Sequence, residues 1–181
     1  SKVADTSKHK RLFLALWPDD FTRQRLANVQ NAFRKTARLK SARPVPSGNL
    51  HITIHFLGEI STEVCARLQT ALADAKAQSC TLVVDHWGYF PRPRVVWLGG
   101  IAPEPLIDLV AQTQSCIQAC IAGYLLKLFV PHITIFRKAR HPLEIDDFDP
   151  NRWRIDRFAL VESVTHPHGA EYNVLNQWML D

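Results

Sequence analysis

Polar and apolar residues alternate along two short stretches of this chain that carry the same four residues. The tetrapeptide His-Ile-Thr-Ile stands at 51–54 and again at 132–135. Successive side chains of a strand point to opposite faces of a sheet. Each stretch therefore directs its isoleucines to one face and its histidine and threonine to the other. We expect two strands that bury an apolar face and present an imidazole and a hydroxyl to a shared, solvated cleft.

The remaining pattern predicts further strands and three helices. Alternating or β-rich runs predict strands over residues 11–17, 50–58, 81–90, 94–100, 129–136, 152–163 and 172–180. Helical spacing of apolar residues predicts helices that begin at Asp19 or Asp20, at Ser61 and after Pro103. Several strands follow one another without an intervening helix, so the order favours an α+β fold with mostly antiparallel sheets over a doubly wound parallel sheet. Because each repeated tetrapeptide follows a helix and a loop, we expect two similar lobes.

The composition limits the class of protein but does not identify a function. A chain of 181 residues with 46% hydrophobic residues fits a single folded domain, which we place at residues 11–181 after a flexible tail over residues 1–10. The sequence contains no apolar run of the roughly 18 residues that span a bilayer, so no membrane segment is expected. A net charge of +5 suits an anionic partner such as nucleic acid. A cytoplasmic monomer is the default expectation.

The repeated histidines indicate acid and base chemistry. A histidine titrates near pH 6.5, so one ring can be neutral while a second is protonated at the working pH. The neutral ring takes a proton from a nucleophile and the charged ring gives one to a leaving group. Threonine hydroxyls on the same face suit the non-bridging oxygens of a phosphoryl group. The pattern is typical of phosphodiester chemistry without a metal; ordinary strand residues, or a metal site at His51, His55 and His132, remain the alternatives.

The chain resembles the 2H phosphoesterase superfamily, which is named for two His-x-Thr motifs. Within it the chain is most similar to the RNA 2′,3′-cyclic phosphodiesterase family, also called 2′-5′ RNA ligases. The residues that carry this resemblance are RLFLALWPDD, NLHITIHFLGE, RVVWLG and VPHITIFRKA, and it covers nearly the whole chain. The resemblance implies two lobes around a central cleft with helices on the outer faces. It also implies hydrolysis of a terminal 2′,3′-cyclic phosphate of RNA to a 2′-phosphate, with no metal or other cofactor.

The family's motif residues carry over one by one. Its catalytic histidines and its phosphate-holding threonines correspond to His51, His132, Thr53 and Thr134. Its arginine, five residues after the second histidine, corresponds to Arg137. Simple alternation aims Arg137 at the isoleucine face, so it reaches the cleft only if the strand ends or bulges near Phe136.

Further expectations concern the substrate and the roles of the histidines. RNA ends or nucleoside 2′,3′-cyclic phosphates are the expected partners, and Phe13 and Phe129 are candidates to stack on a terminal base. Our first assignment makes His132 the base and His51 the acid, but the near symmetry of the motifs allows the reverse. Running the same chemistry backwards would form a 2′-5′ linkage. A non-catalytic RNA-end binding module and a metal-dependent phosphohydrolase are the competing functions.

Overall fold

The structure is a computed structural model that describes residues 8–36, 39–125, 128–140 and 144–181. Its strands are β1 (His9–Leu16), β2 (Arg43–Pro44), β3 (Ile52–Ser61), β4 (Cys80–Val84), β5 (His86–Phe90), β6 (Val95–Gly99), β7 (His132–Arg137), β8 (Asn151–Ile155), β9 (Arg157–His166) and β10 (Gly169–Met179). Its helices are α1 (Asp20–Phe33), the short 3-10 helix η2 (Ser47–Asn49), α2 (Thr62–Leu72) and α3 (Glu104–Cys120). The predicted α+β class is confirmed.

The main sheet brings the two motif strands together near its centre. Its strand order is β10-β9-β1-β3-β7-β6-β5, with β2 paired to β7, and every pairing in it is antiparallel. The first half supplies β1 and β3, and β3 meets β7 of the second half where Ile52 pairs with Ile133. The seam between β3 and β7 therefore falls inside the two repeated tetrapeptides.

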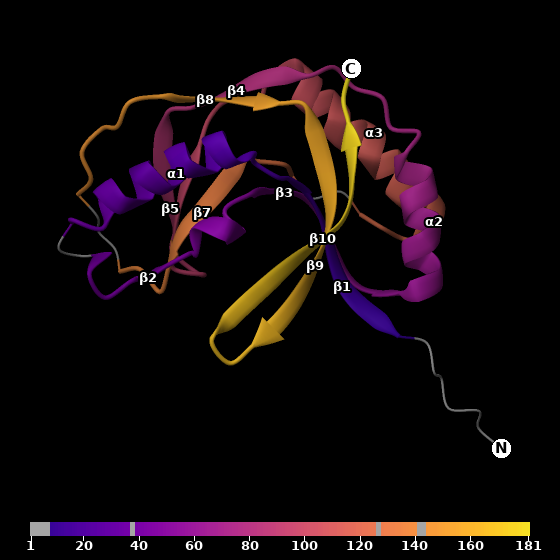
Figure 1. Ribbon diagram of the computed structural model, residues 1–181, viewed down its shortest axis with the longest axis horizontal. Coiled ribbons are helices and arrows are strands. Elements are labelled where there is room, and N and C mark those ends of the chain that lie inside the picture. The colour runs from indigo at the N-terminus through magenta and orange to yellow at the C-terminus, as the bar shows by residue number, and fades with distance from the viewer. Residues whose placement is uncertain (1–7, 37–38, 126–127, 141–143) are drawn as a thin grey trace.

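Capping residues explain where two of the helices begin. The Asp19 carboxylate accepts a hydrogen bond of 2.7 Å from the backbone N–H of Thr22, and the Ser61 hydroxyl accepts one from Val64. These bonds satisfy amide donors that the first turn of a helix leaves unpaired. Helix α1 then packs near β7 (Figure 1), where the Gln30 amide donates to the backbone oxygens of Val45 and Ile135.

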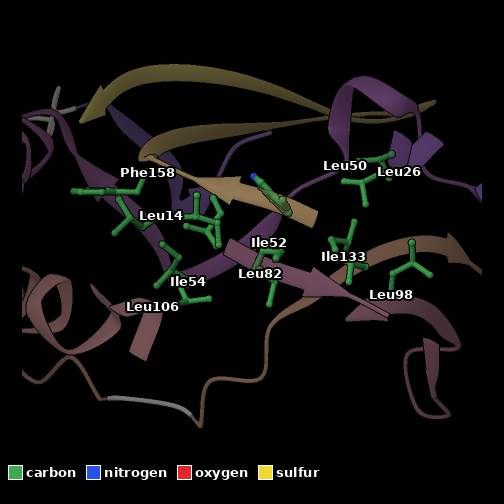
Figure 2. Close-up of a cluster of buried hydrophobic side chains, with 14 of the residues drawn as sticks. Leu14, Leu26, Leu50, Ile52, Ile54, Leu82, Leu98, Leu106, Ile133 and Phe158 are labelled. Carbon is green, nitrogen blue, oxygen red and sulfur yellow. The ribbon is translucent and has the colours of Figure 1, made fainter. Parts of the chain in front are cut away.

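The isoleucines of both motifs lie in the main hydrophobic core. Ile52 and Ile133 are fully buried, and the core extends around them to Leu82 and Leu98 (Figure 2). A second, small apolar cluster of Phe13, Ala15, Ala159 and Val161 packs separately, against Trp17, Tyr172 and Val174. Two apolar clusters with the sheet between them place the polar half of each motif on the face that carries the smaller cluster.

Two predicted strands are each divided between two sheets. The run 81–90 breaks at Asp85, and the run 152–163 breaks at Asp156, so β4 and β8 leave the main sheet and pair with each other. Aspartate is a poor strand former, and apolar periodicity does not reveal which sheet a half-strand joins. His9 and Lys10, which we assigned to a tail, belong to β1 and pair with β3, whereas residues 1–7 lie outside the described residues. Within the described part of the chain, no helix has the length and apolarity needed to traverse a bilayer.

Candidate active site

The four motif residues form a compact quartet across the seam of the sheet. Because Ile52 pairs with Ile133 in antiparallel register, the next positions place His51 opposite Thr134, and Thr53 opposite His132. Opposed residues of an antiparallel pair have Cβ atoms about 4.5–5.5 Å apart and point to the same face. The structure therefore brings both predicted histidines and both predicted threonines into one place. All four line a cavity of about 300 Å³.

A bulge in each motif strand changes the face to which the side chains after the four motif residues point. On β3, Leu14 pairs with His55 and Ala15 with Thr53, so Ile54 is left over. Such an extra residue reverses the alternation beyond it. His55 consequently points into the core, and Phe56 lines the cavity instead.

The second bulge brings Arg137 to the same cavity. On β7, Val96 pairs with Phe136 and Trp97 with Thr134, so Ile135 is the extra residue. Ile135 and Phe136 are both fully buried, whereas Arg137 is exposed and lines the cavity. The strand thus bulges one residue before the position that we expected, and this bulge meets the condition that the sequence set for Arg137.

The hydrogen bonds of His51 define which ring nitrogen faces the substrate. Its Nδ1 lies 2.6 Å from the backbone oxygen of Asn49, and its Nε2 lies 2.9 Å from Oγ1 of Thr53. A carbonyl oxygen only accepts, so Nδ1 carries the proton and donates it. In the neutral ring Nε2 is therefore the free base, and it accepts from the Thr53 hydroxyl.

Burial keeps His51 neutral. Its ring packs against Phe13, Trp17 and Tyr172 at centroid distances of 4.9, 5.8 and 5.3 Å. Desolvation by these neighbours is the largest cause that lowers the pKa of His51 to about 4; the hydrogen bond to Asn49 opposes the shift, and the nearby cations Arg23 and Arg137 add to it. At neutral pH this ring is set to receive a proton.

His132 makes the same kind of hydrogen bond from Nδ1 as His51, but in a more solvent-exposed position. Nδ1 of His132 lies 2.8 Å from the backbone oxygen of Val130, and this bond is exposed to solvent. As for His51, the carbonyl fixes the proton on Nδ1 and leaves Nε2 for chemistry. The ring meets Phe90 and Trp97 at centroid distances of 5.3 and 6.2 Å, both nearly edge-on.

The charge of the cavity suits an anion. Arg11 and Arg137 contribute two guanidinium groups to its lining, none of the described residues lining it is Asp or Glu, and Arg11 lies 5.0 Å from the centroid of the Phe56 ring. A larger cavity of about 610 Å³ beside the end of α1 is lined by Glu144, Asp146 and Asp147. Those carboxylates would repel a phosphate, so we place the site at the smaller cavity.

The two predicted base-stacking residues do not take the positions that we expected. Phe13 lines the cavity but is 4% exposed, and its ring supports His51. Phe129 lies at a separate cavity against Ile107 and Val110 of α3, because the residues before His132 run as a loop towards that helix. The structure therefore does not bring Phe129 to the cavity of the four motif residues, and its stacking on a substrate base stays a prediction.

His55 belongs to a buried network rather than to the site. Its Nε2 lies 2.9 Å from Oγ1 of Thr113, whose hydroxyl donates to the backbone oxygen of Leu109, so Nε2–H is the donor. Its Nδ1 then accepts from the Tyr124 hydroxyl at 2.7 Å. Desolvation lowers the pKa of His55, and both ring nitrogens are occupied. His51, His55 and His132 therefore cannot ligate one metal ion, and among the described residues no group of three His, Cys, Asp or Glu is placed to hold one.

Several residues at the site lie outside the motifs and were missed by sequence reasoning. Arg23 of α1 donates to the backbone oxygens of Ser47 and Leu50, and its guanidinium lies 4.8 Å from the centroid of the Trp17 ring. It thereby fixes the segment that leads into His51. Arg23 looked like one of several helix-surface cations. Only its hydrogen bonds across 24 and 27 residues of sequence reveal this role.

Comparisons with known proteins identify the family of this chain. A family model described as LigT like Phosphoesterase matches residues 16–97. The RNA 2′,3′-cyclic phosphodiesterase of Escherichia coli (strain K12) is 32% identical over 145 residues, which are 78% of this chain and 81% of that protein. The chain belongs to the LigT-like phosphoesterase family.

Solved structures extend the likeness to nearly the full length. The crystal structure of E. coli LigT in apo form superimposes with a TM-score of 0.84 at 30% sequence identity and covers 96% of this chain and 99% of that chain. The same protein complexed with 3′-AMP gives a TM-score of 0.82 at 30% identity, with the same coverage. The LigT-like chain described here is therefore an enzyme, a phosphodiesterase.

Proposed function

We propose that this LigT-like enzyme hydrolyses the terminal 2′,3′-cyclic phosphate of RNA to a 2′-phosphate without a metal ion. The observation that supports the proposal most directly is the quartet of His51, Thr53, His132 and Thr134 around one cavity. Its two Nε2 atoms and two hydroxyls, with the Arg137 guanidinium, match the needs of a phosphodiester. The relatives named RNA 2′,3′-cyclic phosphodiesterase and the LigT complex with 3′-AMP support the choice of an RNA end as substrate.

The reaction is an in-line displacement at phosphorus. A water molecule attacks phosphorus as one histidine removes its proton, the bond from phosphorus to the 3′ oxygen breaks, and the other histidine protonates that oxygen. The products are a 2′-phosphate and a free 3′-hydroxyl. Thr53, Thr134 and Arg137 donate to the non-bridging oxygens, where hydrogen bonds to a charged group are strongest. Thr53 is bonded to Nε2 of His51 in the free enzyme, so its hydroxyl must rotate from that nitrogen to the substrate.

The surroundings of the two rings favour the reverse of our first assignment. His51 is neutral at working pH, since its pKa lies near 4, and a neutral ring is the base that water needs. His132 stands at the more open side of the site, where its hydrogen bond to Val130 is exposed to solvent. We therefore assign the base to His51 and the acid to His132.

Ligation is the same in-line displacement with a different nucleophile, not its reversal. A 5′-hydroxyl replaces water as the nucleophile, attacks the cyclic phosphate and leaves a 2′-5′ phosphodiester with a free 3′-hydroxyl. The acid and base exchange no roles, because nucleophile and leaving group occupy the same two positions. Incubation of two oligonucleotides with suitable ends, followed by sizing of the products, tests this activity.

Product analysis tests the proposed hydrolysis. An oligoribonucleotide that ends in a 2′,3′-cyclic phosphate is incubated with enzyme, with and without EDTA. We expect a 2′-phosphate product at the same rate under both conditions. A 3′-phosphate product would contradict the assigned leaving group, and loss of turnover on chelation would favour a metal-dependent phosphohydrolase.

A further inference from the structure

A second cavity lies beside the candidate active site. It measures about 250 Å³ and shares four lining residues with the catalytic cavity, namely Val45, Asn49, Arg137 and Tyr172. The two cavities are therefore adjacent, with these four residues in the lining of both. We call the second cavity the Arg43 groove, after the additional cation that lines it together with His168.

The walls of the Arg43 groove come from segments that lie far apart in the sequence. One wall is β2 with the residues up to Asn49, and the other is the start of β10 at the turn of the β9–β10 hairpin. Figure 1 shows the tip of this hairpin on the same side of the molecule as β2. The guanidinium of Arg43 donates to the backbone oxygen of His168, and the Asn49 amide donates to that of Ala170 at 3.0 Å. These bonds fix the two walls relative to each other.

Two arginines stand directly opposite each other in this groove. Arg43 of β2 pairs with Arg137 of β7, and both are exposed. Like charges directly opposite on neighbouring strands are destabilising. Of the described residues that line the groove, none is Asp or Glu. An anion bound between the two guanidinium groups would relieve the repulsion and receive charge-assisted hydrogen bonds from both.

The chemistry of the substrate identifies that anion. The cyclic phosphate sits on the last nucleotide of an RNA strand, so the strand continues only through the phosphate that precedes this nucleotide. In the lining of the catalytic cavity, Arg11 lies against the Phe56 ring. The Arg43 groove, in contrast, borders the catalytic cavity and shares Arg137 with it.

We propose that the Arg43 groove binds the internucleotide phosphate that precedes the cyclic-phosphate end, so that the enzyme prefers an oligoribonucleotide to a mononucleotide. This inference rests on the proposed function, because it places the reacting phosphate at the quartet. Arg43 is a specificity-determining residue in this account, and Arg137 contacts both phosphates.

Kinetics on matched substrates test the groove. A nucleoside 2′,3′-cyclic phosphate is compared with a dinucleotide that carries the same end and one internal phosphate. A hydrogen bond to a charged group contributes about 1.5–3 kcal/mol, so we expect wild-type kcat/KM to be roughly tenfold or more higher on the dinucleotide. Arg43→Gln keeps a donor for the His168 oxygen but removes the charge, and should lower the dinucleotide preference by about the same factor. Arg67→Gln, on the exposed face of α2, is the matched control and should keep the preference.

A substrate with an uncharged internucleotide linkage separates the effect of the phosphate charge from the effect of the rest of the added nucleotide. A dinucleotide with a methylphosphonate linkage lacks the internal charge, so the wild type should lose its preference for it, and Arg43→Gln, which keeps only the contact from Arg137, should lose less than the wild type. The groove assignment is overturned if the wild type turns over the mononucleotide and the dinucleotide equally well. It is also overturned if Arg43→Gln lowers kcat/KM equally on both, or if the methylphosphonate costs the variant as much as the wild type. Absence of turnover on every substrate would instead contradict the proposed function itself.

Discussion

The two motif strands β3 and β7 share four residues and one backbone irregularity, yet they differ in the residues that follow. In both strands a histidine donates from Nδ1 to a backbone oxygen two residues earlier, and a bulge follows at the second isoleucine. Four residues after the histidine, β3 has His55 and β7 has Phe136. Five residues after it, β3 has Phe56 and β7 has Arg137.

The motif and its surroundings have different effects on the two histidines. The motif and its bulge set the position of Nε2 and of the side chain five residues after the histidine. They do so in the same way on β3 and β7. The surroundings set the charge state, because His51 is enclosed by aromatic rings and lies near cations. Two nearly identical strands can therefore supply a base and an acid.

Loss of either histidine has the largest expected effect. His51→Ala and His132→Ala should each lower kcat by at least about 10²-fold, since acid and base steps are typically worth 10²–10⁴-fold. His86→Ala, at an exposed histidine beside Asp85, is the control and should retain wild-type kcat. Turnover of a nucleoside 2′,3′-cyclic phosphate measures each variant.

A better leaving group distinguishes the two roles. In a cyclic substrate with sulfur in place of the 3′ oxygen, the thiolate leaves without a proton. The defect of His132→Ala should then shrink to about tenfold or less, while that of His51→Ala should persist at about 10²-fold. The opposite pattern would restore our first assignment of acid and base.

The residue five positions after each histidine gives the next largest expected difference between the two strands. Arg137→Gln should lower kcat/KM by about 10–100-fold, because it removes a charge-assisted hydrogen bond to the phosphate. Phe56→Leu removes only an apolar wall and the contact with Arg11, which is worth about 0.5–1 kcal/mol at an exposed site, and should cost a few-fold. Equal losses in the two variants would show that the strands are used alike, against our account.

The residue four positions after each histidine affects stability rather than catalysis. His55→Ala should lower the free energy of unfolding by about 2–4 kcal/mol at pH 7, because it leaves a cavity and unpaired partners at Thr113 and Tyr124. The conservative change Phe136→Leu on the other strand should cost about 1 kcal/mol. Urea unfolding measures both variants.

The same fourth position predicts a difference in pH dependence. Burial holds the pKa of His51 and His55 below 6.5 in the folded state, so the unfolded chain binds more protons as the pH falls. Stability is therefore full above about pH 6.5 and is lost as the pH falls from there towards the folded pKa, which is about 4 for His51. His55→Ala should show a smaller loss between pH 7 and pH 5 than the wild type, whereas Phe136→Leu should show the same loss.

Strand alternation alone was enough to predict the quartet. His51, Thr53, His132 and Thr134 all precede the bulges, so a regular strand describes them correctly. His55 and Phe56 follow a bulge, so a regular strand would place both on the wrong faces. A bulge arises from the register with β1 or β6, and no local pattern of residues encodes that register.

The remainder of the site depends on contacts between distant segments. Arg43 meets the β9–β10 hairpin at His168, and Tyr172 of the same hairpin packs on His51. Neither contact has a sequence signature, because both follow from the order in which strands join the sheet. The breaks at Asp85 and Asp156 were missed for the same reason: continuous β-rich runs do not show that their halves enter different sheets.

The joint action of the two histidines on one phosphate is tested most directly by a double variant. Residues that act as one unit in a single step are strongly non-additive, so His51→Ala combined with His132→Ala should lower kcat little further than the more damaging single change. Single-turnover hydrolysis of a nucleoside 2′,3′-cyclic phosphate by the wild type, both single variants and the double variant gives the required cycle. Turnover by the double variant within about threefold of the wild type would contradict the account, because a general acid and base pair cannot be worth so little.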